Sequence, residues 1–144
     1  MRALVFDGEL RFCEDYPMPK REAGFALVRV ETVGICNTDL EIVNGYADFT
    51  GVLGHEFVGT VADSDETHLI GCRVVGEINI SCDDCEICGM RLRNHCESRR
   101  VIGIRGCDGA FAEYLAIPDS NLHVVPPKIP NTAAVFTEPL AAAY

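Results

Sequence analysis

A polar, cysteine-rich stretch decides the fold: residues 81–100 read SCDDCEICGMRLRNHCESRR. The stretch lacks the alternation of apolar and polar residues that is typical of a strand. Four of its residues are cysteines with the spacing C-x2-C-x2-C-x7-C, namely Cys82, Cys85, Cys88 and Cys96. We therefore predict that residues 81–100 form a lobe outside the main body of the protein, held together by something other than a hydrophobic core.

The spacing of these cysteines favours a structural zinc site. Four thiolates can surround one Zn²⁺ tetrahedrally at about 2.3 Å, which leaves no coordination position open for chemistry. An iron–sulfur site fits less well, because the fourth cysteine of a ferredoxin usually follows about three residues later and precedes proline, whereas here the gap is seven residues and Glu97 follows. At such a site the free energy of metal binding supplies the free energy of folding, so losing one ligand should unfold the lobe.

Composition limits the class and the compartment of the protein. The 144 residues allow one domain with a real core, and 48% hydrophobic and 24% charged residues argue against a disordered chain. The net charge of −10 argues against nucleic acid or an anionic membrane as a partner. No signal peptide or membrane span is apparent, so we expect a cytoplasmic, reducing location, where clustered cysteines bind metal more often than they form disulfides.

Outside the lobe, short strands alternate with turn residues. A hairpin is expected around Asp7-Gly8, and Pro126–Pro130 reads as a stiff connector. The predicted strands cover residues 3–6, 10–13, 27–33, 57–62, 73–80, 101–104, 111–117 and 122–125. This pattern predicts a mainly β fold with short helices, a partly open β-barrel carrying the lobe.

Two short helices are expected. One covers residues 38–43, with Thr38 or Asp39 as its N-cap and Gly45 after its end. The other begins at an N-cap on Asn131 and runs through Val135 and Phe136. The chain then stops in an apolar, helix-favouring run at residues 140–144, so we expect the natural chain to continue.

A second set of candidate metal ligands lies outside the lobe. Cys36 follows a predicted strand and His55 precedes one; each alone is more often a packing or surface residue. Together with the carboxylates of Asp39, Glu56 and Glu138, they offer sulfur, nitrogen and oxygen donors for an open zinc site.

Five motifs stand in the order found in a known family. They are GICNTD at 34–39, GHEFVG at 54–59, the four-cysteine lobe, GAFAEY at 109–114 and EPLA at 138–141. Over essentially its whole length the chain resembles the N-terminal, GroES-like catalytic domain of the zinc-dependent medium-chain dehydrogenases/reductases. Members with glutamate at the last motif resemble the sorbitol, threonine and glucose dehydrogenase branches.

The resemblance implies an enzyme that oxidises the CH–OH group of an alcohol, polyol or sugar with NAD or NADP. It implies two zinc ions per chain, a structural one in the lobe and a catalytic one on Cys36, His55 and Glu138. A substrate hydroxyl on the catalytic zinc would lose its proton more easily, and the alkoxide could give hydride to the nicotinamide. Related enzymes are dimers or tetramers, so a homo-oligomer is expected.

The resemblance also implies roles for three neighbouring residues. Asp39 would hold the far ring nitrogen of His55, which is compatible with a capping role. Thr38 would pass the substrate proton towards solvent, with a helix cap as the alternative. Glu56 is either an exchanging zinc ligand or an ordinary nearby carboxylate, and both interpretations stay open.

Some positions depart from the family pattern. Glu41 stands where many members have histidine, which puts the outer end of a proton relay in doubt, and Cys72 replaces the aspartate of Gly-Asp-Arg-Val. With Cys13 and Cys107, Cys72 is expected to be unliganded.

In the family that the chain resembles, a Rossmann domain with GxGxxG after a strand binds the cofactor, and no such motif occurs here. The resemblance therefore implies that the cofactor domain follows these 144 residues in a longer protein and that they alone are inactive. The alternative function is a non-enzymatic zinc-binding module with a single zinc ion.

Overall fold

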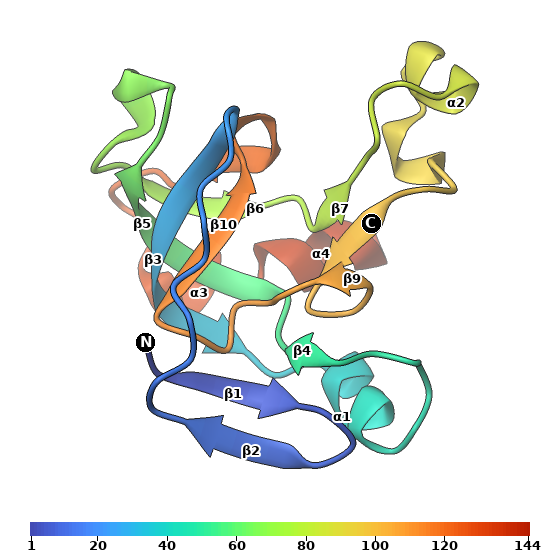
Figure 1. Cartoon of the computed structure of the whole chain (residues 1–144). Helices are drawn as coiled ribbons and strands as arrows, with labels where there is room; N and C mark the ends of the chain where they lie inside the picture. The colour runs from blue at the N-terminus through green and yellow to red at the C-terminus, as the bar shows by residue number, and fades with distance from the viewer.

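Three small sheets form the body of the computed structural model, which describes residues 1–144 (Figure 1). The largest sheet has the strand order β10-β3-β5-β6-β11 and curls into a partly open barrel, as predicted. Its strands are β10 (Tyr114–Pro118), β3 (Phe25–Gly34), β5 (Glu56–Asp63), β6 (Arg73–Gly76) and β11 (Leu122–Val124). All neighbours in this sheet are antiparallel.

The second sheet lies at the bottom of Figure 1 and contains the expected hairpin. Strand β1 (Ala3–Phe6) pairs antiparallel with β2 (Leu10–Cys13), and the turn between them places Gly8 at φ +99°, a conformation that glycine adopts without steric cost. A two-residue strand, β4 (Gly51–Val52), pairs with the other edge of β1. This strand carries the chain directly towards His55.

The main core lies inside the curled sheet. Its twelve buried residues come mostly from alternate positions of the barrel strands, the pattern expected when one face of a strand is buried. They are Ala26, Val28, Phe57, Val61, Leu69, Val74, Ile78, Ile80, Ile102, Ala110, Leu115 and Ile117. This packing makes the barrel a rigid support for the residues at the strand ends.

The structure corrects the expected strand over residues 73–80. Strand β6 ends at Gly76, and Asn79–Ile80 form β7, which belongs to a different sheet with β8 (Arg100–Ile102) and β9 (Gly106–Cys107). Where the chain leaves the five-stranded sheet, Asn121 donates its side-chain amide to the carbonyl oxygens of Glu77 and Asn79. The apolar and polar pattern of these residues does not reveal that side-chain contact.

Strands β8 and β10 also differ from expectation. Strand β8 stops at Ile102, before Gly103, whose φ is +65°. Strand β10 begins at Tyr114 rather than at Phe111, because the backbone of Phe111 bonds instead to Leu53 and Leu4.

The helices are short, as predicted, but their caps are not the expected residues. Helix α1 (Asn37–Val43) has Cys36 as its N-cap, and Asp39 reaches back to accept the Cys36 N–H at 2.9 Å. Helix α3 (Asn131–Ala134) has Pro130 as its N-cap, so Asn131 is the first helical residue, and it ends at Ala134 instead of continuing through Val135 and Phe136. Helix α4 (Thr137–Ala143) follows and carries Glu138 in its first turn. Two 3-10 turns lie outside residues 81–100, namely η1 (Thr67–Leu69) and η3 (Asp119–Asn121).

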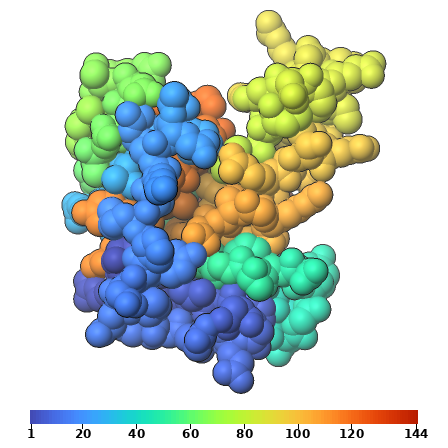
Figure 2. Space-filling view, viewed as in Figure 1, coloured from blue at the N-terminus to red at the C-terminus, as the bar shows by residue number.

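Residues 81–100 form the predicted lobe, which projects from the body in the space-filling view (Figure 2). The lobe contains α2 (Glu86–Gly89) and the 3-10 turn η2 (Arg93–His95). Within it only Cys96 is buried. None of the helices in the structure combines the length and the apolar character that crossing a membrane requires.

Candidate metal centres

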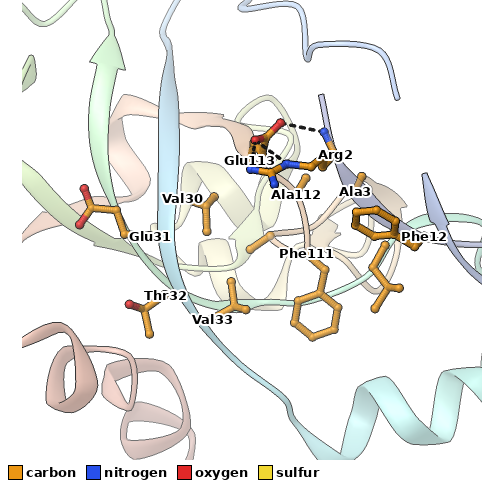
Figure 3. A pocket seen from close by; sticks show the side chains of 12 residues that line it. Arg2, Ala3, Phe12, Val30, Glu31, Thr32, Val33, Phe111, Ala112 and Glu113 are labelled. Carbon is orange, nitrogen blue, oxygen red and sulfur yellow. Dashed lines mark hydrogen bonds and ion pairs between the residues drawn. The ribbon is translucent and has the colours of Figure 1, made fainter. Parts of the chain in front are cut away.

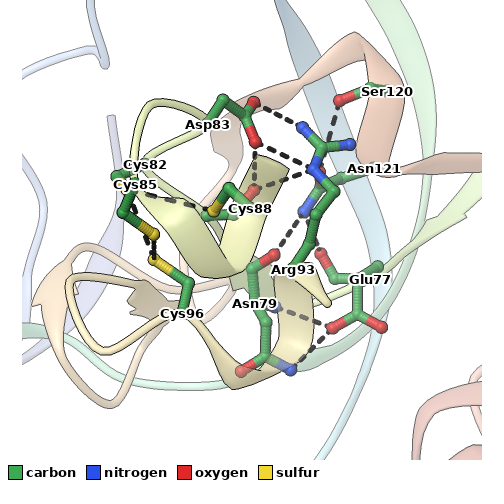
Figure 4. Close-up of polar contacts among 11 residues, drawn as sticks. Glu77, Asn79, Cys82, Asp83, Cys85, Cys88, Arg93, Cys96, Ser120 and Asn121 are labelled. Carbon is green, nitrogen blue, oxygen red and sulfur yellow. Dashed lines mark hydrogen bonds and ion pairs between the residues drawn. The ribbon is translucent and has the colours of Figure 1, made fainter. Parts of the chain in front are cut away.

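The four cysteines of the lobe converge on one point (Figure 4). The Sγ atom of Cys96 lies 3.4 Å from that of Cys82 and 3.9 Å from that of Cys85, and the sulfurs of Cys82 and Cys88 are 3.9 Å apart. Sulfurs bound at about 2.3 Å to one tetrahedral ion lie about 3.8 Å from one another. The donor set therefore fits a closed zinc site.

Local structure explains how these sulfurs meet. Cys85 is the N-cap of α2 and Cys88 lies three residues later, so both side chains lie on one face of the helical turn. Hydrogen bonds from backbone N–H groups, first that of Cys82, lower the pKa of the Cys96 thiol to about 7, which favours the thiolate that a metal binds. Arg93 pairs with Asp83 and also donates to Ser81 at 3.0 Å, which joins the two ends of the lobe.

The second group is made by Cys36, His55 and Glu56, which offer ligand atoms within 4.8 Å of one another. Cys36 follows the end of β3, His55 follows β4, and Glu56 opens β5. His55 is 3% exposed and Glu56 is 5% exposed, so these donors are held inside the protein. A thiolate, an imidazole and a carboxylate in this arrangement suit zinc.

The buried carboxylate of Asp39 contacts the segments that carry Cys36 and His55. Its two carboxylate oxygens accept the N–H of Cys36 at 2.9 Å and the N–H of Gly54 at 3.2 Å, and the side chain is 3% exposed. The same carboxylate lies 3.4 Å from Nδ1 of His55. One buried acid thus contacts both segments that carry the metal donors.

The imidazole of His55 has a buried nitrogen that lacks a hydrogen bond of standard geometry: Nδ1, although it lies close to Asp39. Burial lowers the pKa of His55, but the hydrogen bonding and charge of Asp39 and Cys36 outweigh burial and raise the pKa to about 9. With Nδ1–H directed at the Asp39 carboxylate, Nε2 is the nitrogen left for a ligand. The arrangement therefore suits a metal cation bound at Nε2, where a second proton would otherwise bind.

Two glycines, Gly34 and Gly54, are required for the close packing around Cys36, His55 and Glu56, and their individual roles were not predicted from the sequence. A Cβ on Gly34 would lie 2.1 Å from Oε2 of Glu56, its partner across the β3–β5 ladder. Gly54 has φ +92°, and a Cβ there would meet the ring of Phe111 at 2.3 Å. The sequence feature that could have indicated these roles is their position in the GICNTD and GHEFVG motifs, two residues before Cys36 and one residue before His55.

Glu138 is placed near this group but outside the tight set. Burial raises the pKa of its carboxyl, the charges of Glu56 and Glu77 raise it further, and the positive charge of His55 opposes them. The ligand atoms that lie within 4.8 Å of one another come from Cys36, His55 and Glu56, and Glu138 is not among them. Its role as the third ligand stays a prediction.

The remaining candidates are accounted for by local contacts. The hydroxyl oxygen of Thr38 lies 3.6 Å from the Cys36 sulfur, so it is next to the donor group. Glu41 is exposed and accepts a bond from the side chain of Asn37 at 3.4 Å. Cys13, Cys72 and Cys107 lie in neither cysteine group, and burial raises the pKa of Cys107 to about 11.

An open groove of about 340 Å³ lies between β1 and β3 (Figure 3). Its wall is mostly apolar, including Phe12, Val33 and Phe111, and the Arg2–Glu113 ion pair lies at its edge. None of the seven predicted metal ligands lines it, so the groove is separate from the candidate chemistry.

Known proteins are similar to this chain in both sequence and fold. The profile of the alcohol dehydrogenase GroES-like domain matches residues 22–127. An erythritol/L-threitol dehydrogenase of Mycolicibacterium smegmatis is 35% identical over 98% of this chain and 45% of its own length. An L-threonine 3-dehydrogenase of Streptomyces coelicolor is 41% identical over 85% of this chain and 38% of its own length.

Solved structures show the same arrangement. An alcohol dehydrogenase of Escherichia coli in complex with NADH matches 99% of this chain and 43% of its own, with a TM-score of 0.91 and 30% identity. Galactitol-1-phosphate dehydrogenase of Escherichia coli matches with a TM-score of 0.84 and 29% identity over 97% of this chain and 42% of its own. The chain thus spans less than half the length of these relatives.

Proposed function

Because this chain belongs to the alcohol dehydrogenase GroES-like domain family, we propose that it is the catalytic domain of a zinc-dependent NAD(P) oxidoreductase. The reaction proposed is oxidation of the CH–OH group of an alcohol, polyol or sugar. The observation that carries the proposal is the buried convergence of Cys36, His55 and Glu56 in front of Asp39. The similarity to an erythritol/L-threitol dehydrogenase and to an alcohol dehydrogenase in complex with NADH supports the polyol and nicotinamide parts of the proposal.

Each residue of the proposed centre has a defined task. Zinc held by Cys36, His55 and Glu138 would act as a Lewis acid and lower the pKa of a substrate hydroxyl. Asp39 orients the ring of His55 by facing its Nδ1 at 3.4 Å, and it fixes the backbone on both sides by accepting the N–H groups of Cys36 and Gly54. Thr38, next to the Cys36 sulfur, takes the hydroxyl proton towards solvent. Glu56 supplies negative charge behind the donors and is the candidate exchanging ligand.

The cofactor site is proposed to lie outside these residues. The chain covers only 45% of the erythritol/L-threitol dehydrogenase and 43% of the NADH-bound alcohol dehydrogenase. We therefore assign residues 1–144 to the catalytic domain, with 81–100 as its structural-zinc lobe, and the nicotinamide to a Rossmann domain of a longer protein. That protein is proposed to be a cytoplasmic homo-oligomer, and residues 1–144 alone to be inactive.

Metal analysis tests the proposal directly. The protein should bind two zinc ions per chain, and Cys36→Ser should bind one, because serine replaces the thiolate of the open site only. Cys72→Ser, which removes a thiol that lies in neither group, should still bind two. Elemental analysis of purified protein gives these counts.

A single zinc that Cys36→Ser leaves unchanged would favour the non-enzymatic module, and a brown protein with visible absorbance would favour an iron–sulfur cluster. The longer wild-type protein should also reduce NAD or NADP when it is supplied with polyols.

Two carboxylates compete for the third ligand position, and matched substitutions separate them. Glu138→Gln should weaken binding of the catalytic metal by on the order of 10–100-fold, because the amide is a poorer donor at that position. Glu56→Gln should weaken binding less than Glu138→Gln does, because in this proposal the Glu56 carboxylate lies next to the donors without being the third ligand. Competition titrations with a metal chelator measure both values. The opposite order would make Glu56 the third ligand.

A further inference from the structure

The segment that leads to Glu138 is tied to the five-stranded sheet by one arginine. Arg73 on β6 donates from Nη2 to the carbonyl oxygens of Pro126, at 3.0 Å, and Ile129, at 2.5 Å. Its Nη1 donates to Oδ1 of Asn131 at 2.9 Å. The planar guanidinium therefore holds three acceptors in the connector and the first turn of α3, a geometry that a lysine ammonium cannot reproduce.

A local distortion of the sheet completes this contact. Across the β3–β5 ladder, Val30 faces Gly59 and Thr32 faces Val58, so Glu31 is one extra residue in β3. Such a bulge redirects the side chain of the extra residue. Glu31 accepts a bond from Asn131 Nδ2 at 3.0 Å and one from the Thr60 hydroxyl at 2.7 Å. The hydrogen bonds from Thr60 and Asn131 hold the pKa of Glu31 below its usual value, which keeps the carboxylate an acceptor.

These contacts explain why Asn131 is not the helix cap. Both ends of its amide are used, the oxygen by Arg73 and the nitrogen by Glu31. Thr60 and Arg73 face each other across the β5–β6 ladder, so the polar side chains form one row across β3, β5 and β6. We call Glu31, Arg73 and Asn131 the connector clamp.

The clamp acts on a segment that has little structure of its own. Helices α3 and α4 contain four and seven residues, and helices this short are not stable alone. Ala134 and Val135 pack with Val58, Val75 and Val125, and Thr137 bonds to the carbonyl of Ala134 at 2.7 Å. These tertiary contacts therefore set the position of Glu138, which lies in the first turn of α4, directly after this packed segment.

We propose that the connector clamp is a positioning device for the catalytic metal centre: it holds α3 and α4 so that the Glu138 carboxylate is presented to Cys36 and His55. Arg73 is the central positioning residue and does not touch the metal. The inference rests on the proposed function, because it requires a metal at that centre.

The first test is metal affinity in single variants. Arg73→Gln should weaken binding of Co²⁺ at the catalytic centre roughly tenfold, the lower end of the range for outer contacts of a metal site. Co²⁺ binding is followed by visible absorbance, after the four-cysteine site has been filled with zinc. Arg73→Lys should restore less than half of the Co²⁺ affinity that Arg73→Gln loses, because lysine keeps the positive charge but lacks the planar guanidinium that bonds to three acceptors at once.

Arg21→Gln is the matched control. Arg21 forms ion pairs with Asp63 and Asp65 beyond the other end of the same sheet, so its loss should leave Co²⁺ affinity unchanged. If Arg73→Gln does not fold, Asn131→Ala removes the link to Glu31 and should give a smaller loss of the same kind. Equal losses in Arg21→Gln and the clamp variants would overturn the proposal.

The second test asks whether Arg73 acts through Glu138. In a Glu138→Gln background, Arg73→Gln should cause no further loss of Co²⁺ affinity, because the ligand it positions is gone. Additive losses would show that Arg73 acts by another route and would overturn the inference while the proposed function stands. A wild-type protein that binds no metal at Cys36 would instead overturn the proposed function.

Discussion

Replacing Cys96 by serine should remove one zinc ion per chain and unfold residues 81–100 while the five-stranded sheet stays folded. Cys96 is fully buried between Cys82 and Cys85, and serine offers a poor ligand for this closed site. The apolar side chains of the lobe cannot replace the metal, because Met90 is 56% exposed and Leu92 is 46% exposed. Structural zinc supplies on the order of 10 kcal/mol of folding free energy in small zinc domains, so its loss should dominate every other contact in the lobe.

Hydrogen exchange resolved by mass spectrometry measures this outcome. In Cys96→Ser, amides of residues 81–100 should lose their protection, while amides of β3 and β5 should keep theirs. Cys107→Ser is a suitable control, because Cys107 is a half-buried thiol outside both metal groups. Protection of the lobe that survives both Cys96→Ser and a strong chelator would show that apolar or ionic contacts, such as Arg93–Asp83, hold it instead.

Sequence reasoning predicted the features that depend on residue type and spacing. Four cysteines at C-x2-C-x2-C-x7-C meet in space as expected, because the spacing places Cys85 and Cys88 on one helical turn. Cys36 and His55 also meet, at the ends of strands that the β-branched pattern identified. The barrel itself follows from short strands and turn residues.

Features that depend on side-chain contacts between distant segments could not be predicted. Asn131 has the composition of a helix cap, yet Arg73 and Glu31 compete successfully for its amide. Residues 73–80 have the pattern of one strand, but the strand is interrupted at Glu77, where Asn121 bonds to the carbonyl oxygens of Glu77 and Asn79, and Asn79–Ile80 pair in another sheet. Neither competition is visible in a window of sequence around the residue concerned.

The choice between Glu56 and Glu138 has the same origin. Glu56 is next to His55 in sequence and joins the tight donor group, whereas Glu138 arrives from the far end of the chain on a short helix. Sequence alone offers both carboxylates. We expect the connector clamp to decide which of them reaches a bound metal, because the clamp fixes α4.

Asp39→Asn should abolish most binding of the catalytic metal and most of the activity of the longer enzyme, with little effect on the four-cysteine site. The carboxylate accepts the N–H groups of Cys36 and Gly54 and faces Nδ1 of His55. An amide has one accepting oxygen, so its NH₂ group must face either a backbone N–H or the imidazole. If it donates to Nδ1, the ring proton moves to Nε2, the nitrogen needed by the metal.

The expected loss in metal affinity is about 10–100-fold, with about 1–3 kcal/mol of stability from the backbone N–H left without an acceptor. Chelator titration and thermal unfolding measure the two effects separately. Asp108→Asn is the matched control, because Asp108 also accepts a backbone N–H on β4, that of Val52 at 2.9 Å, and bonds to Tyr16. It should lose stability and keep its metal affinity. Equal metal loss in both variants would show that any weakening of the β4 region disturbs the centre, and that Asp39 has no specific role in orienting His55.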